Sequence, residues 1–514
     1  MARTLQIPGA MNGTLSAKRL GVDTYRQAVV FMREDCPVCR SEGFEALTQV
    51  RVHAPDKSII AILNVITTDL IGEGEAGLSE EAWRRLGVED GTPLTLDHAP
   101  PLESFAHVRA KMYGHRLDYL PLKEVLHDIK EGFYPDVHVA AFLTACAGNA
   151  LDLDEITALT EAMVDVGQRL TWPTDCVVDK HCVGGLAGNR TTPIVVAIAA
   201  AAGLTIPKTS SRAITSPAGT ADVMATMTCV NLDLETLQRV VREHGGCLAW
   251  GGSVGLSPVD DLLIRIERAL DVDSVGQLVA SILSKKAAAG STRVLIDIPW
   301  GPTAKLRSLE AASALARDLE EVGRRIGMAV TTLLTDGSQP VGRGIGPALE
   351  AHDVLAVLRL QADAPHDLRS RALTLAGRLL ELGGAAPLRA GGQMAKKILD
   401  SGAAWERFLA ICEAQGGFQE PPRAALLESV TAPRAGVVTT IDNRRLSRAA
   451  KLAGAPADVC AGIELHAHVD DRVERGQSLF TVHAESPGEL NYAMHYVRAQ
   501  GDIFRVEPDD GGAW

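Results

Sequence analysis

The sequence predicts a multidomain α/β protein with an N-terminal β-domain, a small helical domain, a large α/β domain with a mostly parallel sheet, and a C-terminal α+β domain. The chain has 514 residues, and at roughly 150 residues per domain this length gives three or four domains. Hydrophobic residues make up 46% of the chain and charged residues 22%, which is typical of folded globular proteins. Blocks of strand-like apolar runs also alternate with blocks of helical periodicity.

The first domain is expected over residues 1–98. Residues 29–31 and 59–66 are short apolar runs that are typical of β-strands. Glycines then interrupt the chain, and Pro100 and Pro101 indicate a linker. We therefore expect a β-rich domain that ends before these prolines.

The second domain is expected over residues 102–171. Apolar residues recur at three- and four-residue spacing within 117–129, 139–146 and 156–166. Asp152 and Asp154 are suited to cap the last of these helices. A later segment at about 258–288 is expected to join this helical domain.

The third domain is expected over residues 172–425 and the fourth over 430–510. In the third, apolar runs at 176–179, 294–298 and 328–334 alternate with longer helical patterns, an order that favours a parallel sheet with helices on its faces. In the fourth, strand-like runs occupy 436–441, 462–469 and 478–482.

Charge and composition narrow the function classes. The chain has 51 Lys and Arg residues against 64 Asp and Glu residues, a net charge of -13, so we expect no nucleic-acid partner. No apolar run is long enough to span a membrane, and nine scattered cysteines are not the pattern of a disulfide scaffold. We expect a cytoplasmic protein with reduced thiols and no membrane contact.

A glycine-rich turn at residues 179–193 is the first candidate ligand site. The sequence DKHCVGGLAGNRTTP runs from a strand into a helix, with Thr191 or Thr192 suited to the N-cap and Pro193 to the first helical turn. Backbone N–H groups of such a turn can bind an anion, and Lys180 adds a positive charge. The alternative is a glycine turn that only reverses the chain.

The segment 208–222 is the second candidate site. The sequence KTSSRAITSPAGTAD places six hydroxyl side chains and two cations within 13 residues. Hydroxyl groups suit phosphate and ribose oxygens, and an arginine can bind a phosphate through two N–H groups. Alone, this segment is typical of an ordinary Ser/Thr-rich loop, but beside the first motif it favours a shared anion site.

The two motifs together resemble the thymidine phosphorylase family, in which DKH-x-x-GG is followed by S-x-R and GT-x-D. The resemblance covers most of the chain, including SILSKK at 281–286 and the tail from about Pro433. The first 98 residues resemble the extra domain of the long form of this family, which includes archaeal AMP phosphorylase.

The resemblance implies phosphorolysis: phosphate attacks C1′ of a nucleoside or nucleoside 5′-monophosphate, the base leaves, and a sugar 1-phosphate or ribose 1,5-bisphosphate forms. It implies phosphate binding by Lys180, Thr191, Ser210 and Thr220. It implies nucleotide contacts in the AMP type by Gly185, Ser211, Arg212, Ala213, Ile214, Thr215, Ser216, Thr220, Ser281 and Lys305. In the thymidine type, it implies that Ser281 and Lys285 hold the pyrimidine. Asp273 would donate a proton to the base, and His181 would face the sugar or base.

Three further expectations follow from the resemblance. Inorganic phosphate is a co-substrate, and no cofactor or metal is expected. The protein is expected to be a homodimer or a larger homo-oligomer. Cys182 stands where the family usually has a phosphate-contacting serine, and because a thiol is a weaker donor, we interpret it as a tolerated replacement.

Two alternatives from other classes stay open at this point. An anthranilate-type phosphoribosyltransferase would share the fold but would need a divalent ion and nearby carboxylates. A nucleotide sensor without catalysis would bind ligand and release no base. A lone CxxC at Cys36 and Cys39, and the histidines 466, 468 and 483, are interpreted as structural rather than as metal sites.

Overall fold

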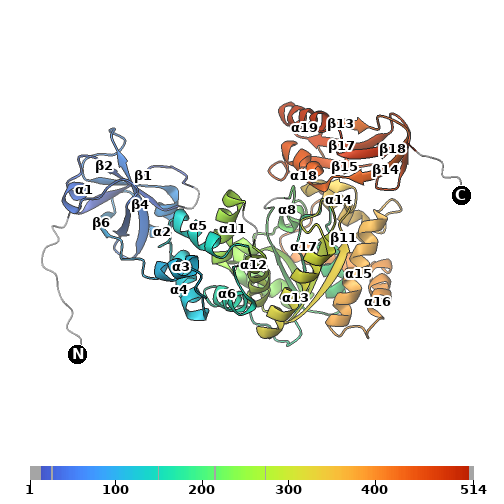
Figure 1. The fold of residues 1–514 in the computed structure, drawn as a ribbon, viewed down its shortest axis with the longest axis horizontal. Helices are drawn as coiled ribbons and strands as arrows, with labels where there is room; N and C mark the ends of the chain where they lie inside the picture. The colour runs from blue at the N-terminus through green and yellow to red at the C-terminus, as the bar shows by residue number, and fades with distance from the viewer. Residues whose placement is uncertain (1–12, 25–26, 149, 214–215, 272–273, 509–514) are drawn as a thin grey trace. The chain divides into compact units, whose positions relative to one another are not determined.

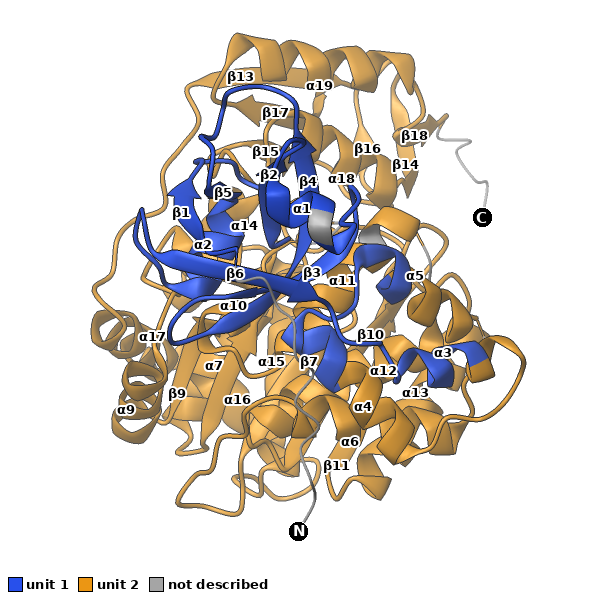
Figure 2. Ribbon diagram, turned by 90° about the vertical axis from the view of Figure 1, so that its left-hand side faces the viewer, with its two compact units in different colours: residues 1–109, 127–139 blue, residues 110–126, 140–514 orange. Residues whose placement is uncertain are grey.

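The computed structural model describes residues 13–508, except 25–26, 149, 214–215 and 272–273. The chain forms two units, residues 1–109 with 127–139 and residues 110–126 with 140–514 (Figure 2). The predicted fold class is confirmed, and each unit is described by itself.

The first unit contains a closed barrel with the strand order β1-β5-β2-β4-β3-β6 (Figure 1). Its strands are β1 (Leu15–Arg19), β2 (Val29–Arg33), β3 (Gln49–His53), β4 (Ser58–Ile66), β5 (Glu75–Leu78) and β6 (Pro93–His98), with helices α1 (Pro37–Glu42) and α2 (Glu80–Leu86). Closure pairs β1 with both β5 and β6, which leaves no open sheet edge. Cys36 and Cys39 are buried in the barrel core.

Helices follow the barrel, as the periodicity predicted. They are α3 (Phe105–Met112), α4 (Tyr119–Glu131), α5 (Asp136–Ala145), α6 (Leu153–Asp165), α11 (Pro258–Leu270) and α12 (Val275–Ala288). Asp152 caps α6 by accepting hydrogen bonds from the backbone of Asp154 and Glu155. Within the second unit, α12 packs on α6, and the Gln277 side chain donates to the Leu143 carbonyl at 3.0 Å.

The α/β core contains five parallel strands. They are β7 (Val178–Cys182), β8 (Ile206–Ser210), β9 (Gly246–Trp250), β10 (Arg293–Trp300) and β11 (Ala329–Asp336). The order β11-β10-β7 and the pair β8-β9 are joined by one parallel bridge between Val177 and Thr205. The strand expected at 176–179 begins two residues later and continues to Cys182, because its pairing with β10 reaches Asp297.

Helices cover this sheet and form the largest hydrophobic core. They are α7 (Thr192–Ala201), α8 (Thr220–Ala225), α9 (Leu234–His244), α10 (Gly251–Val254), α13 (Leu309–Arg325), α14 (Pro347–Leu358), α15 (His366–Leu382), α16 (Gly391–Asp400) and α17 (Ala403–Ala414). Helix α7 is buried along its whole length and contacts α15 and α17. Its alanines therefore face protein on every side, as a helix without a polar stripe requires.

The C-terminal part is an α+β domain built on two antiparallel sheets. Its elements are β12 (Gly344–Ile345), β13 (Leu426–Thr431), β14 (Gly436–Ile441), α18 (Asn443–Leu452), β15 (Gly462–Leu465), β16 (Arg472–Val473), β17 (Ser478–Ala484), α19 (Pro487–Ala499) and β18 (Phe504–Glu507). The sheets have the orders β12-β15-β17-β13 and β16-β14-β18. The strand expected to reach residue 469 ends at Leu465, so His466 and His468 lie beyond it.

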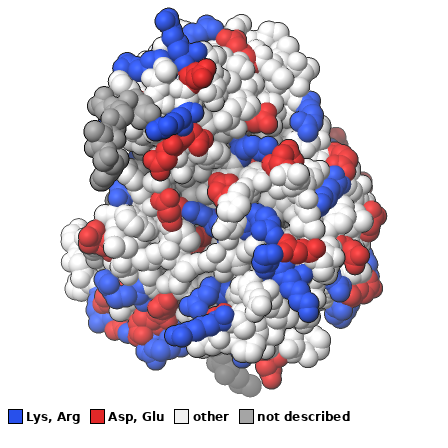
Figure 3. Space-filling view, turned by 90° about the vertical axis from the view of Figure 1, so that its right-hand side faces the viewer, with Lys and Arg blue, Asp and Glu red and all other residues white. Residues whose placement is uncertain are grey.

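Two surface properties bear on function. No helix in the described part of the chain is long and apolar enough to cross a membrane. On the face shown in Figure 3, Lys and Arg side chains are interspersed with Asp and Glu. Mixed charge of this kind is typical of a solvated surface rather than of a surface that follows a nucleic-acid backbone.

A buried ion pair between Lys111 and Glu155 generates the first prediction. The Lys111 ammonium lies 2.6 Å from the Glu155 carboxylate, and both side chains are over nine-tenths buried. Replacement of Glu155 by Ala should lower the free energy of unfolding by about 3–5 kcal/mol, because it leaves a buried ammonium unpaired. Urea titration followed by circular dichroism measures this change.

The exposed pair of Lys130 and Glu131, at 3.9 Å, gives the matched control. Glu131→Gln should change the free energy of unfolding by less than about 1 kcal/mol. Equal effects of the two replacements would contradict the expectation for Glu155.

Candidate active site

The candidate site lies at the carboxyl ends of the central strands. The strand order runs from β7 to β8 and β9 on one side, and to β10 and β11 on the other. The order in which strands are added to the sheet thus reverses between β7 and β10, and in parallel sheets this switch point is where ligands bind. The glycine-rich loop follows β7, and the loop with Lys305 follows β10.

These two loops are in close contact, and glycine is needed where they meet. Gly185 has a φ of +78°, and a Cβ atom there would lie 2.4 Å from Cβ of Lys305. Gly188 has a φ of +69°, and its Cβ would lie 2.4 Å from the carbonyl oxygen of Val341. The glycine loop therefore fits between the loops after β10 and β11, and a side chain at either position would push it out.

Lys180 contributes an enclosed positive charge below the glycine loop. Its side chain is fully buried, and its ammonium donates to the Thr191 hydroxyl at 2.8 Å and to Thr192 at 3.3 Å. No carboxylate among the described residues lies within ion-pair distance of Lys180, and burial lowers its pKa. A buried cation with only hydroxyl partners is a strong site for an anion, because an unpaired buried charge is costly.

Thr191 occupies the N-cap position of α7, as expected, but its side chain does not cap the helix. Its hydroxyl accepts from Lys180 instead. The residue connects the buried ammonium with the start of the helix.

A buried carboxylate on β10 is hydrogen-bonded to the glycine loop. Asp297, on β10, is fully buried and accepts hydrogen bonds from Asn189 at 3.2 Å and from Thr335 at 2.7 Å. Asn189 also donates to the sulfur of Cys182 at 3.5 Å. Burial and the Asp297 carboxylate raise the pKa of Cys182 to about 11, so this thiol is protonated at neutral pH and is a poor nucleophile.

A second group of buried charges is centred on Asp179 of β7. The fully buried Asp179 carboxylate pairs with the Lys286 ammonium at 2.7 Å and the Lys208 ammonium at 3.3 Å. Two ammonium groups around one carboxylate favour a net positive cluster. Burial, together with the neighbouring Lys208, lowers the pKa of Lys286 to about 7. No role was predicted for Asp179, Lys208 or Lys286; the sequence signal for Asp179 and Lys208 was their place inside the two motifs.

His181 lies beside these cations. Burial lowers its pKa well below the usual value, and the ammonium groups of Lys286, Lys208, Lys285 and Lys180 lower it further. The imidazole is therefore neutral near pH 7. It can donate one hydrogen bond and accept another, but it carries no imidazolium proton to release as a general acid.

Among the described residues of the second candidate segment, Asp222 makes hydrogen bonds with Arg212, Ala213 and Gly219. The Asp222 carboxylate accepts hydrogen bonds from the backbone of Ala213 at 2.6 Å and Gly219 at 2.9 Å. The Arg212 guanidinium pairs with Asp222 at 3.2 Å and lies over the Trp250 ring at 5.0 Å. Arg212, for which the resemblance implies a substrate contact, is thus paired with Asp222 in this structure.

Arg190 joins the two motifs and was missed by the sequence analysis. Its guanidinium donates to the Thr220 hydroxyl at 2.7 Å and to the Ala218 carbonyl at 2.9 Å, and it pairs with the buried Glu350 carboxylate at 2.7 Å. Thr220 thus keeps a hydroxyl hydrogen to donate to a ligand. Proximity to Lys180 in sequence was the only available signal for Arg190.

The residues expected on the base side lie on α12. Lys285 donates to the Asp260 carboxylate at 2.6 Å and to the Ser281 hydroxyl at 3.0 Å. Helix α12 contacts β7 through the next residue, because the Lys286 ammonium lies 2.7 Å from the Asp179 carboxylate. The Ser210 hydroxyl, at the end of β8, donates to the Ala249 carbonyl at 3.3 Å.

The C-terminal domain supports the loop after β10. Asn443, the first residue of α18, is buried and donates to the Thr303 hydroxyl at 3.0 Å and to the Gly337 carbonyl at 3.2 Å. One side chain therefore fixes the loops after β10 and β11 together. Lys305 lies two residues beyond Thr303 and contacts Gly185.

The structure leaves part of the predicted site unplaced. Asp273, Ile214 and Thr215 lie outside the described residues, so nothing is said of their structure. Ser211 is exposed, and Ser216 is half-buried and donates to the Ala218 carbonyl at 2.9 Å. Among the described residues, no group of three or more His, Cys, Asp or Glu side chains is arranged to hold a metal ion. The predicted roles of all these residues stay predictions.

Three family models match the chain. Residues 106–167 match the helical bundle domain of a glycosyl transferase family, and residues 174–405 match its a/b domain. Residues 437–503 match the C-terminal domain of pyrimidine nucleoside phosphorylases. The matches follow the order of the helical, α/β and C-terminal parts of the chain.

Curated relatives match over nearly the full length. "Putative thymidine phosphorylase 1" of Acidovorax sp. (strain JS42) is 59% identical over 96% of this chain and 97% of its own. The proteins named "Putative thymidine phosphorylase" of Hahella chejuensis and Legionella pneumophila (strain Paris) are 57% and 55% identical, over 96% and 95% of this chain and 98% and 95% of theirs.

The fold is similar to that of a solved phosphoribosyltransferase. The anthranilate phosphoribosyltransferase of Thermus thermophilus aligns with a TM-score of 0.51 and 20% identity, over 60% of this chain and 99% of its own. At this identity the likeness shows the fold alone.

The neutral state of His181 is the second prediction. Because its pKa lies well below the usual value, its imidazole resonances should not shift between pH 6 and 8. Nuclear magnetic resonance of ¹³C-histidine-labelled protein, with the signal assigned by His181→Asn, measures this. A midpoint near 6.5, as an unperturbed histidine has, would contradict the electrostatic account of the site.

Proposed function

Because the chain belongs to the thymidine phosphorylase family, we propose that it cleaves the N-glycosidic bond of a nucleoside or nucleoside 5′-monophosphate with inorganic phosphate. The products are the free base and a pentose 1-phosphate, or ribose 1,5-bisphosphate from a monophosphate. The observation that supports this proposal most directly is the buried Lys180 ammonium, which has no carboxylate partner among the described residues.

Phosphate binds above Lys180 in this mechanism. The ammonium, the backbone N–H groups of the glycine loop and the hydroxyls of Thr191, Ser210 and Thr220 surround the anion. Charge-assisted hydrogen bonds of this kind are about twice as strong as neutral ones. Because Arg190 and Glu350 fix the loop beforehand, these donors need little rearrangement when the anion binds.

The bound phosphate then acts on the sugar. Its oxygen attacks C1′, the bond between C1′ and the base nitrogen breaks, and the electron pair leaves with the base. The transition state resembles an oxocarbenium ion, so an anion held next to C1′ stabilises it. Phosphate must therefore be on one face of the sugar and the base on the other.

The base leaves toward α12. Ser281 and Lys285 hydrogen-bond to it, and the neutral His181 orients the sugar or base. Asp273 supplies the proton that the departing base takes up. The Lys285 ammonium donates to the Asp260 carboxylate at 2.6 Å, which fixes the position of this side chain.

We propose a 5′-monophosphate as the preferred substrate class, with a pyrimidine nucleoside as the second candidate. The Ser/Thr-rich segment 208–222 and the extra N-terminal domain support the monophosphate. The names of the relatives support thymidine. We also propose that the enzyme needs no cofactor and is cytoplasmic. We further propose that it forms a homodimer or a larger homo-oligomer, and light scattering of the full chain tests this oligomeric state.

Release of free base from a substrate panel tests the function. The panel contains AMP, CMP, UMP, adenosine, cytidine, uridine and thymidine, each with and without inorganic phosphate, analysed by chromatography. We expect release that depends on phosphate and persists after dialysis against EDTA. Release of base that requires pyrophosphate in place of phosphate, together with a divalent ion, would favour the phosphoribosyltransferase. Binding of a substrate without release of base would favour the nucleotide sensor.

The third prediction concerns Lys180. Lys180→Gln removes a buried charge that faces phosphate, so the KM for phosphate should rise about 10- to 100-fold, the loss expected for a hydrogen bond to a charged group. The KM for the nucleoside or nucleotide should change much less. Steady-state kinetics with each substrate varied in turn measures both values.

The exposed Lys397 on α16 provides the control for this variant. Lys397→Gln should leave both KM values unchanged. A Lys180→Gln enzyme that folds normally and keeps the wild-type KM for phosphate would disprove the assignment of Lys180.

A further inference from the structure

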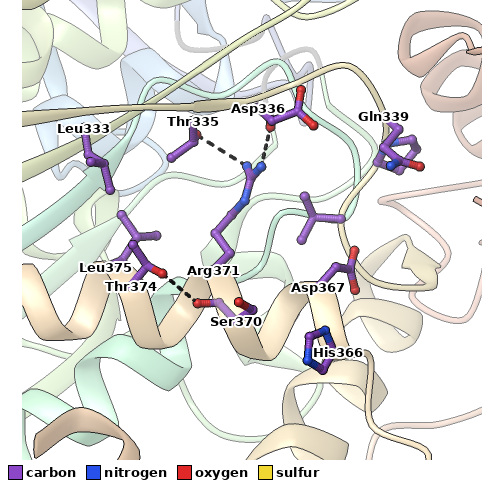
Figure 4. A pocket seen from close by; sticks show the side chains of 12 residues that line it. Leu333, Thr335, Asp336, Gln339, His366, Asp367, Ser370, Arg371, Thr374 and Leu375 are labelled. Atoms are coloured by element: carbon purple, nitrogen blue, oxygen red, sulfur yellow. Dashed lines mark hydrogen bonds between the residues drawn. The ribbon is translucent and has the colours of Figure 1, made fainter. Parts of the chain in front are cut away.

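A cavity lies at the end of β11, and none of its lining residues is among those assigned to phosphorolysis. Its volume is about 380 Å³, and its wall is formed by the end of β11, the following loop and α15 (Figure 4). The lining includes Thr335, Asp336, Gln339, Asp367, Ser370 and Arg371. A cavity of this size is large enough for a small metabolite.

Arg371 is the charged centre of this cavity. Its guanidinium extends from α15 toward the end of β11 (Figure 4), where it donates to the Thr335 hydroxyl at 3.5 Å and to the backbone carbonyl of Asp336. Both partners are neutral, and within the described part of the chain no carboxylate lies within ion-pair distance of this guanidinium. Its remaining N–H groups match the oxygens of a phosphate.

The rim of the cavity adds acceptors for hydroxyl groups. Asp336 accepts from the backbone of Ser338 at 2.9 Å, and Asp367 accepts from the backbone of Gly342 at 2.8 Å. Each carboxylate keeps further lone pairs. They would repel a bare anion, but they suit the hydroxyls of a polyol, and the Ser370 side chain lies on the same wall (Figure 4).

We propose that this cavity binds a phosphorylated sugar. The phosphate group pairs with Arg371, and the sugar hydroxyls donate to Asp336 and Asp367. The combination of one arginine with two flanking carboxylates selects a molecule that has both an anionic end and several hydroxyls. Inorganic phosphate lacks the hydroxyls, and a free sugar lacks the anion.

Hydrogen bonds connect the cavity with the glycine loop. Thr335, which accepts from Arg371, donates to Asp297 at 2.7 Å, and Asp297 accepts from Asn189 of the glycine loop at 3.2 Å. A ligand that draws the Arg371 guanidinium toward itself changes the hydrogen bond between Arg371 and Thr335. Sugar phosphate in the cavity therefore alters the affinity of the glycine loop for phosphate, and the effect is reciprocal. This coupling rests on the proposed function, whereas binding in the cavity does not.

Isothermal titration calorimetry of the full chain tests the binding. The experiment uses the Lys180→Gln background, which weakens the reaction site, with ribose 5-phosphate, inorganic phosphate and ribose as probes. We expect one ribose 5-phosphate site, with at least tenfold weaker binding of the other two probes. Adding Arg371→Gln should weaken ribose 5-phosphate at least tenfold.

Two further variants isolate the cavity. Ser370→Phe should block binding by filling the space without removing Arg371. Arg378→Gln, on the same helix and paired with Glu381 at the surface, should have no effect. Absence of ribose 5-phosphate binding in the Lys180→Gln protein, unchanged binding in both cavity variants, or equal affinity for inorganic phosphate would overturn the proposal.

Kinetics test the coupling separately. Ribose 5-phosphate should shift the KM for phosphate at least twofold more in the wild-type enzyme than in Ser370→Phe. In the variant the cavity is filled, so ribose 5-phosphate can only compete at the reaction site. Equal shifts would overturn the coupling and leave the calorimetric result intact. If no substrate releases base, the proposed function fails, but the calorimetric test still decides whether the cavity binds sugar phosphate.

Discussion

The enclosed ammonium of Lys180 is the constraint on which the site depends. It sits on the strand that precedes the glycine loop, with two threonine hydroxyls as neighbours. Nearby carboxylates have other partners: Asp179 pairs with Lys208 and Lys286, Glu350 pairs with Arg190, and Asp297 accepts hydrogen bonds from Asn189 and Thr335. Burying a charge without a counter-ion is costly. The fold therefore keeps a positive site at Lys180 that an incoming anion neutralises. In the proposed reaction the same ammonium binds phosphate and, through it, stabilises the transition state.

Fixed geometry is the second requirement, and several distant segments supply it. The glycine loop fits against the loops after β10 and β11 because Gly185 and Gly188 have no side chains. Arg190 ties this loop to the Ser/Thr-rich segment, and Asn443 of the C-terminal domain fixes the loops after β10 and β11. Donors held in place before the ligand arrives favour the charged transition state without a cost of reorganisation.

Much of the fold could be predicted because apolar periodicity reports local structure. The strands at 59–66, 294–298 and 436–441 were found nearly at their observed bounds. Strand ends were predicted less well, because they depend on a partner: β7 continues to Cys182 only because β10 lies beside it. The two-residue strand β12 could not be predicted, because a strand this short has no periodicity and exists through its pairing with β15.

The sequence by itself determined which segments contain anion-binding groups, because glycine, hydroxyl and cationic side chains cluster along the chain at 179–193 and 208–222. Only the tertiary structure decided how those charges are used. It paired Lys286 with Asp179, 107 residues away, engaged Arg212 with Asp222, and left Lys180 among hydroxyls. Charge partners are set by distance and burial in space, and neither quantity can be read from the order of residues along the chain.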